Sequence, residues 1–136
     1  MIVVDTGVLY AYFDADDPHQ SEAATLLEAS DEVCIVSPFV VAELDYFVLS
    51  RFGLDAEVSM LEELLDGAYE LPPITRLDVA ACSAVVTRYA DKRIGITDAS
   101  LVVLADRYRT NRIASYDRRH FTTMRGLDGR PFELLP

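Results

Sequence analysis

The chain alternates between short apolar runs and longer segments whose apolar residues recur every three or four positions. The short runs predict strands at residues 2–4, 33–36, 69–71, 112–116 and 131–135. The segments between them predict helices at residues 8–13, 18–29, 38–53, 54–65, 76–91 and 98–110. Because parallel strands need crossover connections, this alternation predicts an α/β fold with helices on both faces of a parallel sheet.

Several helix starts carry a capping signal. Asp17 and Ser37 each precede a proline, which suits the first position of a helix. Thr75 and Thr97 stand before the last two predicted helices. We expect these four side chains to cap the helices that follow them.

Length and composition narrow the class of protein. The chain has 136 residues, 51% hydrophobic and 26% charged, which fits one globular domain spanning residues 1–136. No apolar run approaches the roughly 18 residues that a membrane helix needs, and the first residues lack the basic region of a signal peptide. Cys34 and Cys82 lie in apolar surroundings, as buried thiols of a reducing cytosol do. We therefore expect a cytoplasmic protein that does not enter a membrane.

Charge is distributed unevenly along the chain. The net charge of −11 by itself disfavours a nucleic-acid partner. Residues 1–75, however, hold 16 acidic residues and one basic residue, whereas residues 76–136 hold 11 basic and 7 acidic residues. A polyanion could therefore approach the second half, provided that nearby acidic groups are neutralised.

Two aspartates directly follow predicted strands. Asp5 ends the first strand, and Asp117 follows the fourth. The crevice beyond the carboxyl ends of parallel strands is the usual ligand site of open α/β sheets. Each residue also has a purely structural interpretation, Asp5 as a helix N-cap and Asp117 as a turn residue.

Two further carboxylates lie on predicted helices. Glu43 shares a helix face with apolar side chains, where a carboxylate is costly unless it is paired or binds a metal. The acidic half offers only Arg51 as a partner, two turns away, so the burial argument favours a functional role for Glu43. Asp98 begins its helix on the apolar side, and its structural alternative is a favourable interaction with the helix dipole.

These four carboxylates would need a cation if folding brought them together. Two carboxylates about 4 Å apart repel by about 4 kcal/mol at an effective dielectric constant of about 20. Oxygen ligands without His or Cys select a hard ion, which indicates Mg²⁺ or Mn²⁺. Such sites perform phosphoryl chemistry because the metal orients and activates water.

Four motifs in succession resemble those of PIN-domain ribonucleases. They are Asp5-Thr6, Val41-Ala42-Glu43-Leu44, Ile96-Thr97-Asp98-Ala99-Ser100-Leu101, and Ser115-Tyr116-Asp117 with His120-Phe121. The resemblance covers essentially the whole chain and is closest to the VapC-type toxins of bacterial VapBC toxin–antitoxin pairs. It implies a three-layer α/β/α fold with a parallel sheet of four to five strands in the order 3-2-1-4-5.

The resemblance also implies an activity and partners. Members of the family cleave RNA with Mg²⁺ or Mn²⁺, form homodimers, and are inhibited by an antitoxin within a hetero-oligomer. We therefore expect an endoribonuclease that acts on structured cellular RNA of the tRNA or rRNA class.

The acidic residues carry over from the family one by one. Asp5, Glu43 and Asp98 match its metal-binding triad, and Asp117 matches a more variable fourth acid. On this basis all four are expected to bind metal and to be catalytic.

Neighbouring polar positions carry over as well, with one departure. Thr6 and Ser115 match polar positions that line the same pocket. Gly7 stands where a serine is common in the family, so a hydroxyl beside the site is lost.

The basic half supplies candidate RNA contacts. Arg112, Arg118, Arg119 and His120 flank Asp117. Cations beside an acidic crevice can bind phosphates on either side of a scissile bond, although most surface arginines serve solubility alone.

Other functions use some of the same residues. Asp5-Thr6-Gly7 is also the aspartic-protease triplet, but such proteases need an all-β fold. Metal-dependent phosphatases and receiver domains also place acids at strand ends, yet position 7 is glycine rather than a second aspartate, and Lys92 is the only lysine. A PIN-like binding module without catalysis is the remaining alternative, and the presence of all four acids argues against it.

Overall fold

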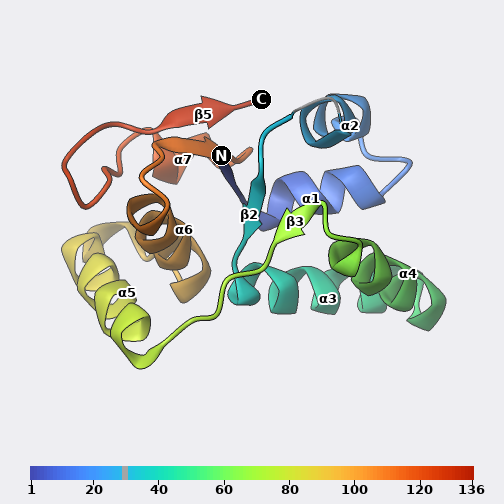
Figure 1. The fold of residues 1–136 in the computed structure, drawn as a ribbon, viewed down its shortest axis with the longest axis horizontal. Coiled ribbons are helices and arrows are strands. Elements are labelled where there is room, and N and C mark those ends of the chain that lie inside the picture. The colour runs from blue at the N-terminus through green and yellow to red at the C-terminus, as the bar shows by residue number, and fades with distance from the viewer. Residues whose placement is uncertain (29–30) are drawn as a thin grey trace.

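The computed structural model describes residues 1–28 and 31–136 and confirms the alternation of strands and helices (Figure 1). A 3₁₀ turn spans Ala90–Lys92. In chain order the other elements are β1 (Ile2–Val4), α1 (Thr6–Phe13), α2 (Gln20–Glu28), β2 (Cys34–Val36), α3 (Pro38–Phe52), α4 (Leu54–Leu65), β3 (Tyr69–Glu70), α5 (Arg76–Arg88), α6 (Ile96–Arg107), β4 (Arg112–Ala114), α7 (Arg118–Phe121) and β5 (Glu133–Leu135).

The strands form one parallel sheet with β1 at its centre. The strand order is β3-β2-β1-β4-β5, as the family resemblance implies. Val4, the last residue of β1, is in register with Val36 of β2 and with Ala114 of β4. The residues that follow these three strands therefore meet at one edge of the sheet.

Helices cover the sheet on both sides. The chain moves from β1 to β2 to β3 through α1–α4, and then crosses to β4 through α5 and α6. Right-handed crossovers in opposite directions place the two sets of helices on opposite faces. Figure 1 shows α5 and α6 on one side of the sheet and α1–α4 on the other, which confirms the three-layer α/β/α architecture.

The core lies between the sheet and these helices. Every residue of β1 and β2 is buried, and α6 is buried continuously from Ala99 to Ala105. Cys34 and Cys82 are buried free thiols, as expected. Among the described residues, no helix combines the length and apolar character needed to cross a membrane.

Two of the predicted caps are confirmed. Ser37 accepts a hydrogen bond from the backbone N–H of Phe39 at the start of α3. Thr75 and Asp78 form a reciprocal capping box at the start of α5.

Other element boundaries differ from the prediction. Helix α2 begins at Gln20 rather than residue 18, because Asp17 accepts from the N–H of His19 within a turn. Thr97 is not a cap, since α6 begins one residue earlier at Ile96, after Gly95. The short helix α7 was not predicted, and the predicted helix end at Ala29 lies outside the described residues.

Candidate active site

Asp5 lies where the two central strands end. Its backbone N–H donates to the carbonyl of Ala114, so it continues the pairing of β1 with β4. The hydroxyl of Ser115, the residue after β4, donates to Oδ2 of Asp5 at 2.6 Å. Oδ1 of Asp5 accepts from the N–H of Thr6 at 2.7 Å and thereby caps α1. The structural and functional interpretations of Asp5 are therefore compatible.

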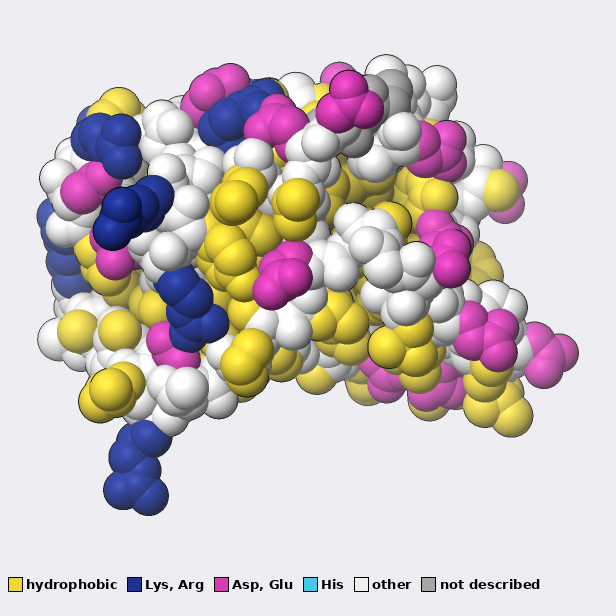
Figure 2. Space-filling model, in the orientation of Figure 1, with side chains coloured by type: hydrophobic (Ala, Val, Ile, Leu, Met, Phe, Trp, Pro, Cys, Tyr) yellow, Lys and Arg dark blue, Asp and Glu magenta, His cyan; other side chains and the backbone are white. Residues whose placement is uncertain are grey.

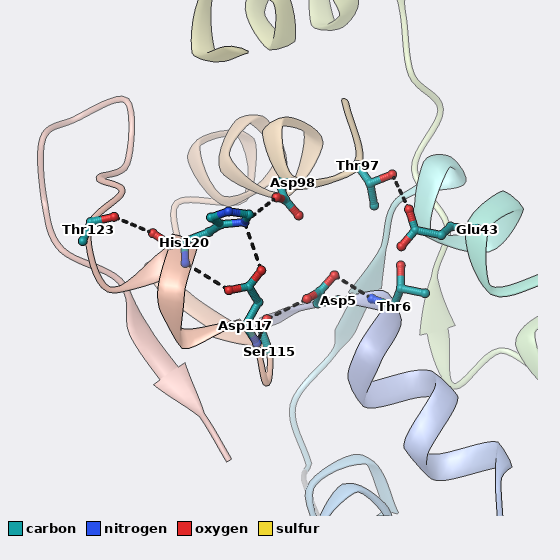
Figure 3. A network of polar contacts seen from close by, with 9 residues as sticks. All are labelled: Asp5, Thr6, Glu43, Thr97, Asp98, Ser115, Asp117, His120 and Thr123. Carbon is teal, nitrogen blue, oxygen red and sulfur yellow. Dashed lines mark hydrogen bonds and ion pairs between the residues drawn. The ribbon is translucent and has the colours of Figure 1, made fainter. Parts of the chain in front are cut away.

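Glu43 and Asp98 reach the same region from two helices. Oε2 of Glu43 on α3 accepts from the hydroxyl of Thr97 on α6 at 3.2 Å. The hydroxyls of Ser37 and Ser100 are hydrogen-bonded at 2.8 Å and join the first turns of the same two helices. Asp98 therefore stands in the first turn of a helix that is tied directly to the helix carrying Glu43 (Figure 3).

Asp117 and His120 complete the network from the chain after β4. The backbone N–H of Asp117 donates to the Ser115 hydroxyl at 2.9 Å, and Oδ1 of Asp117 accepts from the N–H of His120 at 3.0 Å. Asp117 thereby caps α7. Nδ1 of the His120 ring lies 2.9 Å from Oδ2 of Asp117 and 3.2 Å from Oδ2 of Asp98.

The carboxylates interact electrostatically across the site. Burial raises the pKa of Asp5 to about 6, with further contributions from the charges of Asp98 and Glu43 and opposition from its Ser115 and Thr6 hydrogen bonds. Burial also raises the pKa of Asp98, opposed by His120 and reinforced by the charges of Asp117 and Glu43. Like-charge repulsion thus links all four predicted acids.

The donors are of the kind that binds a divalent cation, because carboxylate oxygens are the ligands that Mg²⁺ and Mn²⁺ prefer. Among the described residues, Asp98, Asp117 and His120 each offer a ligand atom within 4.8 Å of the other two. The carboxylates of Asp5 and Glu43 face the same space but lie outside this close group (Figure 3). Oγ1 of Thr6 is buried, has no hydrogen-bond partner among the described residues, and points toward Glu43. A water or an ion among these carboxylates would satisfy that hydroxyl.

The burial argument for Glu43 is wrong. The buried stripe of α3 is formed by Val40, Leu44 and Val48, four residues apart, and Glu43 lies on the exposed flank of this stripe. That flank faces the strand ends, which is why Glu43 reaches Thr97 without entering the core.

Gly7 leaves room for the missing serine. A Cβ atom at this position would meet nothing within 4 Å. Packing therefore does not require glycine here.

The four predicted phosphate contacts are not brought together. Arg112 lies at the opposite end of β4 from Asp117, in ion pairs with Glu32 and Glu133. It is therefore remote from the carboxylates, because a parallel strand directs its two ends to opposite edges of the sheet. Arg118 donates to the carbonyl of Pro136 at 2.7 Å.

Arg119 and His120 do lie beside the site. With Lys92 and Asp91 they line a cavity of about 150 Å³. Sequence reasoning placed His120 among the phosphate contacts and missed its approach to two carboxylates. The three-residue spacing from Asp117 was the available signal, since residues three apart share one face of a helical turn.

Comparison with known proteins identifies the family of this chain. Residues 2–127 match the PIN domain family. The chain is 46% identical to Ribonuclease VapC26 of Mycobacterium tuberculosis over 135 residues, which cover 99% of this chain and all of that protein.

Two solved structures share the fold at lower sequence identity. VapC20 of M. tuberculosis, described as a sarcin–ricin loop cleaving toxin, has a TM-score of 0.80 and 19% identity over 87% of this chain and 91% of that one. VapBC2 of Rickettsia felis, bound to a DNA fragment from its promoter, has a TM-score of 0.71 and 18% identity over the whole of both chains. Family match, full-length relative and fold coincide, and the chain belongs to the PIN-domain family and, within it, to the VapC-type ribonucleases.

Proposed function

We propose that residues 1–136 act as a single PIN domain, a Mg²⁺- or Mn²⁺-dependent endoribonuclease toxin held inactive by an antitoxin. The observation that carries this proposal is the meeting of four carboxylates beyond the carboxyl ends of β1 and β4. A buried aspartate with a pKa of about 6 beside three other acids is unfavourable for the fold alone. The unfavourable free energy of these neighbouring charges is explained if the acids bind a cation.

The proposed roles follow from the position of each acid. Asp5 and Asp98 hold the principal ion, and Glu43 completes its surroundings directly or through water. Asp117 holds a second ion or orients the attacking water. The bound ion supplies an activated water and stabilises charge that develops on the phosphate oxygens. Ser115 keeps the Asp5 carboxylate oriented, because its hydroxyl donates to Oδ2.

The substrate is proposed to be structured RNA of the tRNA or rRNA class. VapC20, which shares the fold, is described as cleaving the sarcin–ricin loop, a structured RNA element. Arg119 and Lys92 border a cavity next to His120, where they can bind a phosphate adjoining the scissile bond. Water attacks in line and displaces the 3′-oxygen, which leaves a 5′-phosphate.

The proposed protein partners are a second copy of the chain and an antitoxin. Toxin–antitoxin complexes occur among the solved structures with this fold. A groove of about 330 Å³ between the end of α1, α3 and α4 is a candidate binding site for the antitoxin. Its lining combines an apolar set with a polar and acidic one: Phe13, Ala15, Val48, Phe52, Ala56 and Met60, and Asp14, Asp16, Ser59 and Glu63. We place this assembly in the cytoplasm, the compartment that keeps the two buried thiols reduced.

Cleavage by purified protein tests the proposed function. Protein freed of antitoxin is expected to cut total tRNA or rRNA with Mn²⁺ or Mg²⁺ and to lose all activity in EDTA. Asp98→Asn is expected to reduce the rate by at least about a hundredfold while the circular dichroism spectrum stays unchanged.

Glu62→Gln is the matched control. Glu62 is an exposed acid on α4, outside the site, so its variant should cut at the wild-type rate. Cleavage by Asp98→Asn at the wild-type rate would refute the site assignment. Folded wild-type protein that binds RNA but cuts none would favour a binding module instead.

A further inference from the structure

His120 approaches two site carboxylates with the same ring nitrogen. Nδ1 lies 2.9 Å from Oδ2 of Asp117 and 3.2 Å from Oδ2 of Asp98 (Figure 3). An imidazole Nδ1 carries at most one hydrogen, so it can donate a well-directed hydrogen bond to only one of these oxygens. The His120 side chain is 19% exposed, so most of its surface is covered by the protein.

Local structure brings this nitrogen to the carboxylates. Asp117 caps α7 by accepting from the backbone N–H of His120, and residues three apart in a helical turn share a face. The ring is therefore directed over Asp117 and toward the first turn of α6, where Asp98 stands.

The distances fit a shared metal ion. One ligand atom from each of Asp98, Asp117 and His120 lies within 4.8 Å of the other two. Adjacent ligands of an octahedral ion, each about 2.1 Å from it, are about 3.0 Å apart. Both nitrogen–oxygen distances at Nδ1 are close to this separation.

We propose that His120 is a nitrogen ligand of a divalent ion that it shares with Asp98 and Asp117. The inference rests on the proposed nuclease function and deepens it by naming the ion. Mg²⁺ takes oxygen ligands, whereas first-row transition ions also accept imidazole. A set of two carboxylates and one imidazole therefore selects Mn²⁺ over Mg²⁺ at this position.

This role changes what His120 does in the site. The ring nitrogen that faces the carboxylates is not available to an RNA phosphate. Arg119 and Lys92, which line the adjoining cavity, remain as the cations for that contact. Metal binding is thus assigned to His120, and phosphate binding to its neighbour Arg119 on α7 and to Lys92 on the 3₁₀ turn.

Pulsed electron paramagnetic resonance on the Mn²⁺-loaded, RNA-free wild-type protein tests the inference directly. A histidine ligand produces a ¹⁴N modulation of the Mn²⁺ spin echo, and carboxylate or water ligands do not. We expect this modulation in the wild type. The measurement needs no variant and no catalytic activity.

His120→Asn supplies the second arm. The asparagine side chain replaces the nitrogen donor by an oxygen donor at a similar reach. We expect the ¹⁴N modulation to vanish and Mn²⁺ affinity to fall about tenfold or more, with Mg²⁺ affinity changed by less than about threefold. His19→Asn is the matched control at the chain's other histidine, which is exposed and stacks on Tyr116, and it should leave both affinities unchanged.

The outcomes separate this inference from the proposed function. Mn²⁺ that binds the wild type without ¹⁴N modulation, or binds His120→Asn equally tightly, overturns the role of His120 and leaves a carboxylate nuclease intact. A wild-type protein that binds neither Mn²⁺ nor Mg²⁺ and cuts no RNA refutes both.

Discussion

At the scale of single residues, Asp5 stabilises the start of α1 as its N-cap but carries a charge that destabilises the folded protein. Its carboxylate caps α1 and accepts from Ser115, yet burial and two neighbouring acids raise its pKa to about 6. A carboxyl group whose pKa is higher in the folded than in the unfolded chain favours folding while it is protonated. That contribution is complete below pH of about 4 and is lost as the pH rises through about 6.

Asp5→Asn is therefore expected to stabilise the metal-free protein at neutral pH. A shift of about two pKa units corresponds to about 3 kcal/mol of unfavourable free energy for the ionised carboxylate in the folded state. Roughly 1 kcal/mol of this gain is lost, because the neutral amide accepts the hydrogen bond from the Thr6 N–H less strongly than the carboxylate does. We expect the free energy of unfolding to rise by about 1–2 kcal/mol at pH 7.5 in EDTA. Urea denaturation measures it, and the gain should disappear at pH 4.

Glu62→Gln provides the control for this titration, and Mg²⁺ provides a second comparison. The exposed Glu62 lies outside the carboxylate network, so its variant should have the same free energy of unfolding as the wild type at both pH values. Mg²⁺ should stabilise the wild type, because the folded state alone forms the site, and should stabilise Asp5→Asn much less. An Asp5→Asn variant that is less stable than wild type at pH 7.5 would contradict the proposed carboxylate repulsion.

At the scale of elements, the strands and most helices could be predicted because their apolar periodicity is local. The end of β1 therefore placed Asp5 correctly, whereas β4 ends at Ala114, three residues before Asp117 and not directly before it. The family resemblance supplied the strand order. The exposure of Glu43 could not be predicted, because it depends on which flank of α3 faces the strand ends. Thr97 was misassigned for a similar reason: its hydroxyl bonds to Glu43 across two helices, a tertiary contact that outweighs the local capping preference.

The contact between the first turns of α3 and α6 is expected to be structurally important. Ser37 is fully buried, caps α3 and bonds to the hydroxyl of Ser100. Ser37→Ala should lower the free energy of unfolding by about 1–2 kcal/mol, since it removes a cap and a buried hydrogen bond. It should also slow RNA cleavage in Mg²⁺, because Asp98 lies at the start of α6 and Glu43 one turn further along α3.

Ser50→Ala on the same helix is the control. Ser50 is exposed, and its hydroxyl donates to the carbonyl of Tyr46, one turn earlier on the same helix. Thermal and urea unfolding should place this variant within about 0.5 kcal/mol of the wild type. If Ser37→Ala and Ser50→Ala lowered the free energy of unfolding equally, the hydrogen bond between α3 and α6 would contribute nothing to stability.

At the scale of the whole molecule, basic side chains gather in one half, which also carries acidic side chains, and the other half is almost entirely acidic among its charged residues. On the face drawn in Figure 2, Lys and Arg side chains gather over the half that holds α5, and Asp and Glu dominate over α2 and α4. The carboxylates of the candidate site lie where the two halves meet, since Asp5 and Glu43 come from the first and Asp98 and Asp117 from the second. If these carboxylates bind the proposed metal, RNA that approaches from the basic half reaches it without crossing the acidic helices.

This arrangement predicts which arginines bind RNA. Arg119 lines the cavity beside the site, whereas Arg112 is held in ion pairs at the opposite edge of the sheet. On an Asp98→Asn background, which binds RNA without cutting it, Arg119→Gln should weaken RNA binding about fivefold, equivalent to roughly 1 kcal/mol. The slope of log affinity against log salt concentration should fall by about 1, because one phosphate contact is lost.

Arg112→Gln on the same background separates a local contact from a general effect of charge. Both variants remove one positive charge, so long-range attraction to RNA changes equally in the two proteins. Only the loss of a phosphate contact distinguishes them, and Arg112→Gln should therefore keep the salt slope of its parent. Filter binding or fluorescence anisotropy across a salt series measures both quantities. Equal weakening by the two substitutions would show that the basic half attracts RNA without a defined contact at Arg119, and the cavity beside His120 would then lose its assigned role.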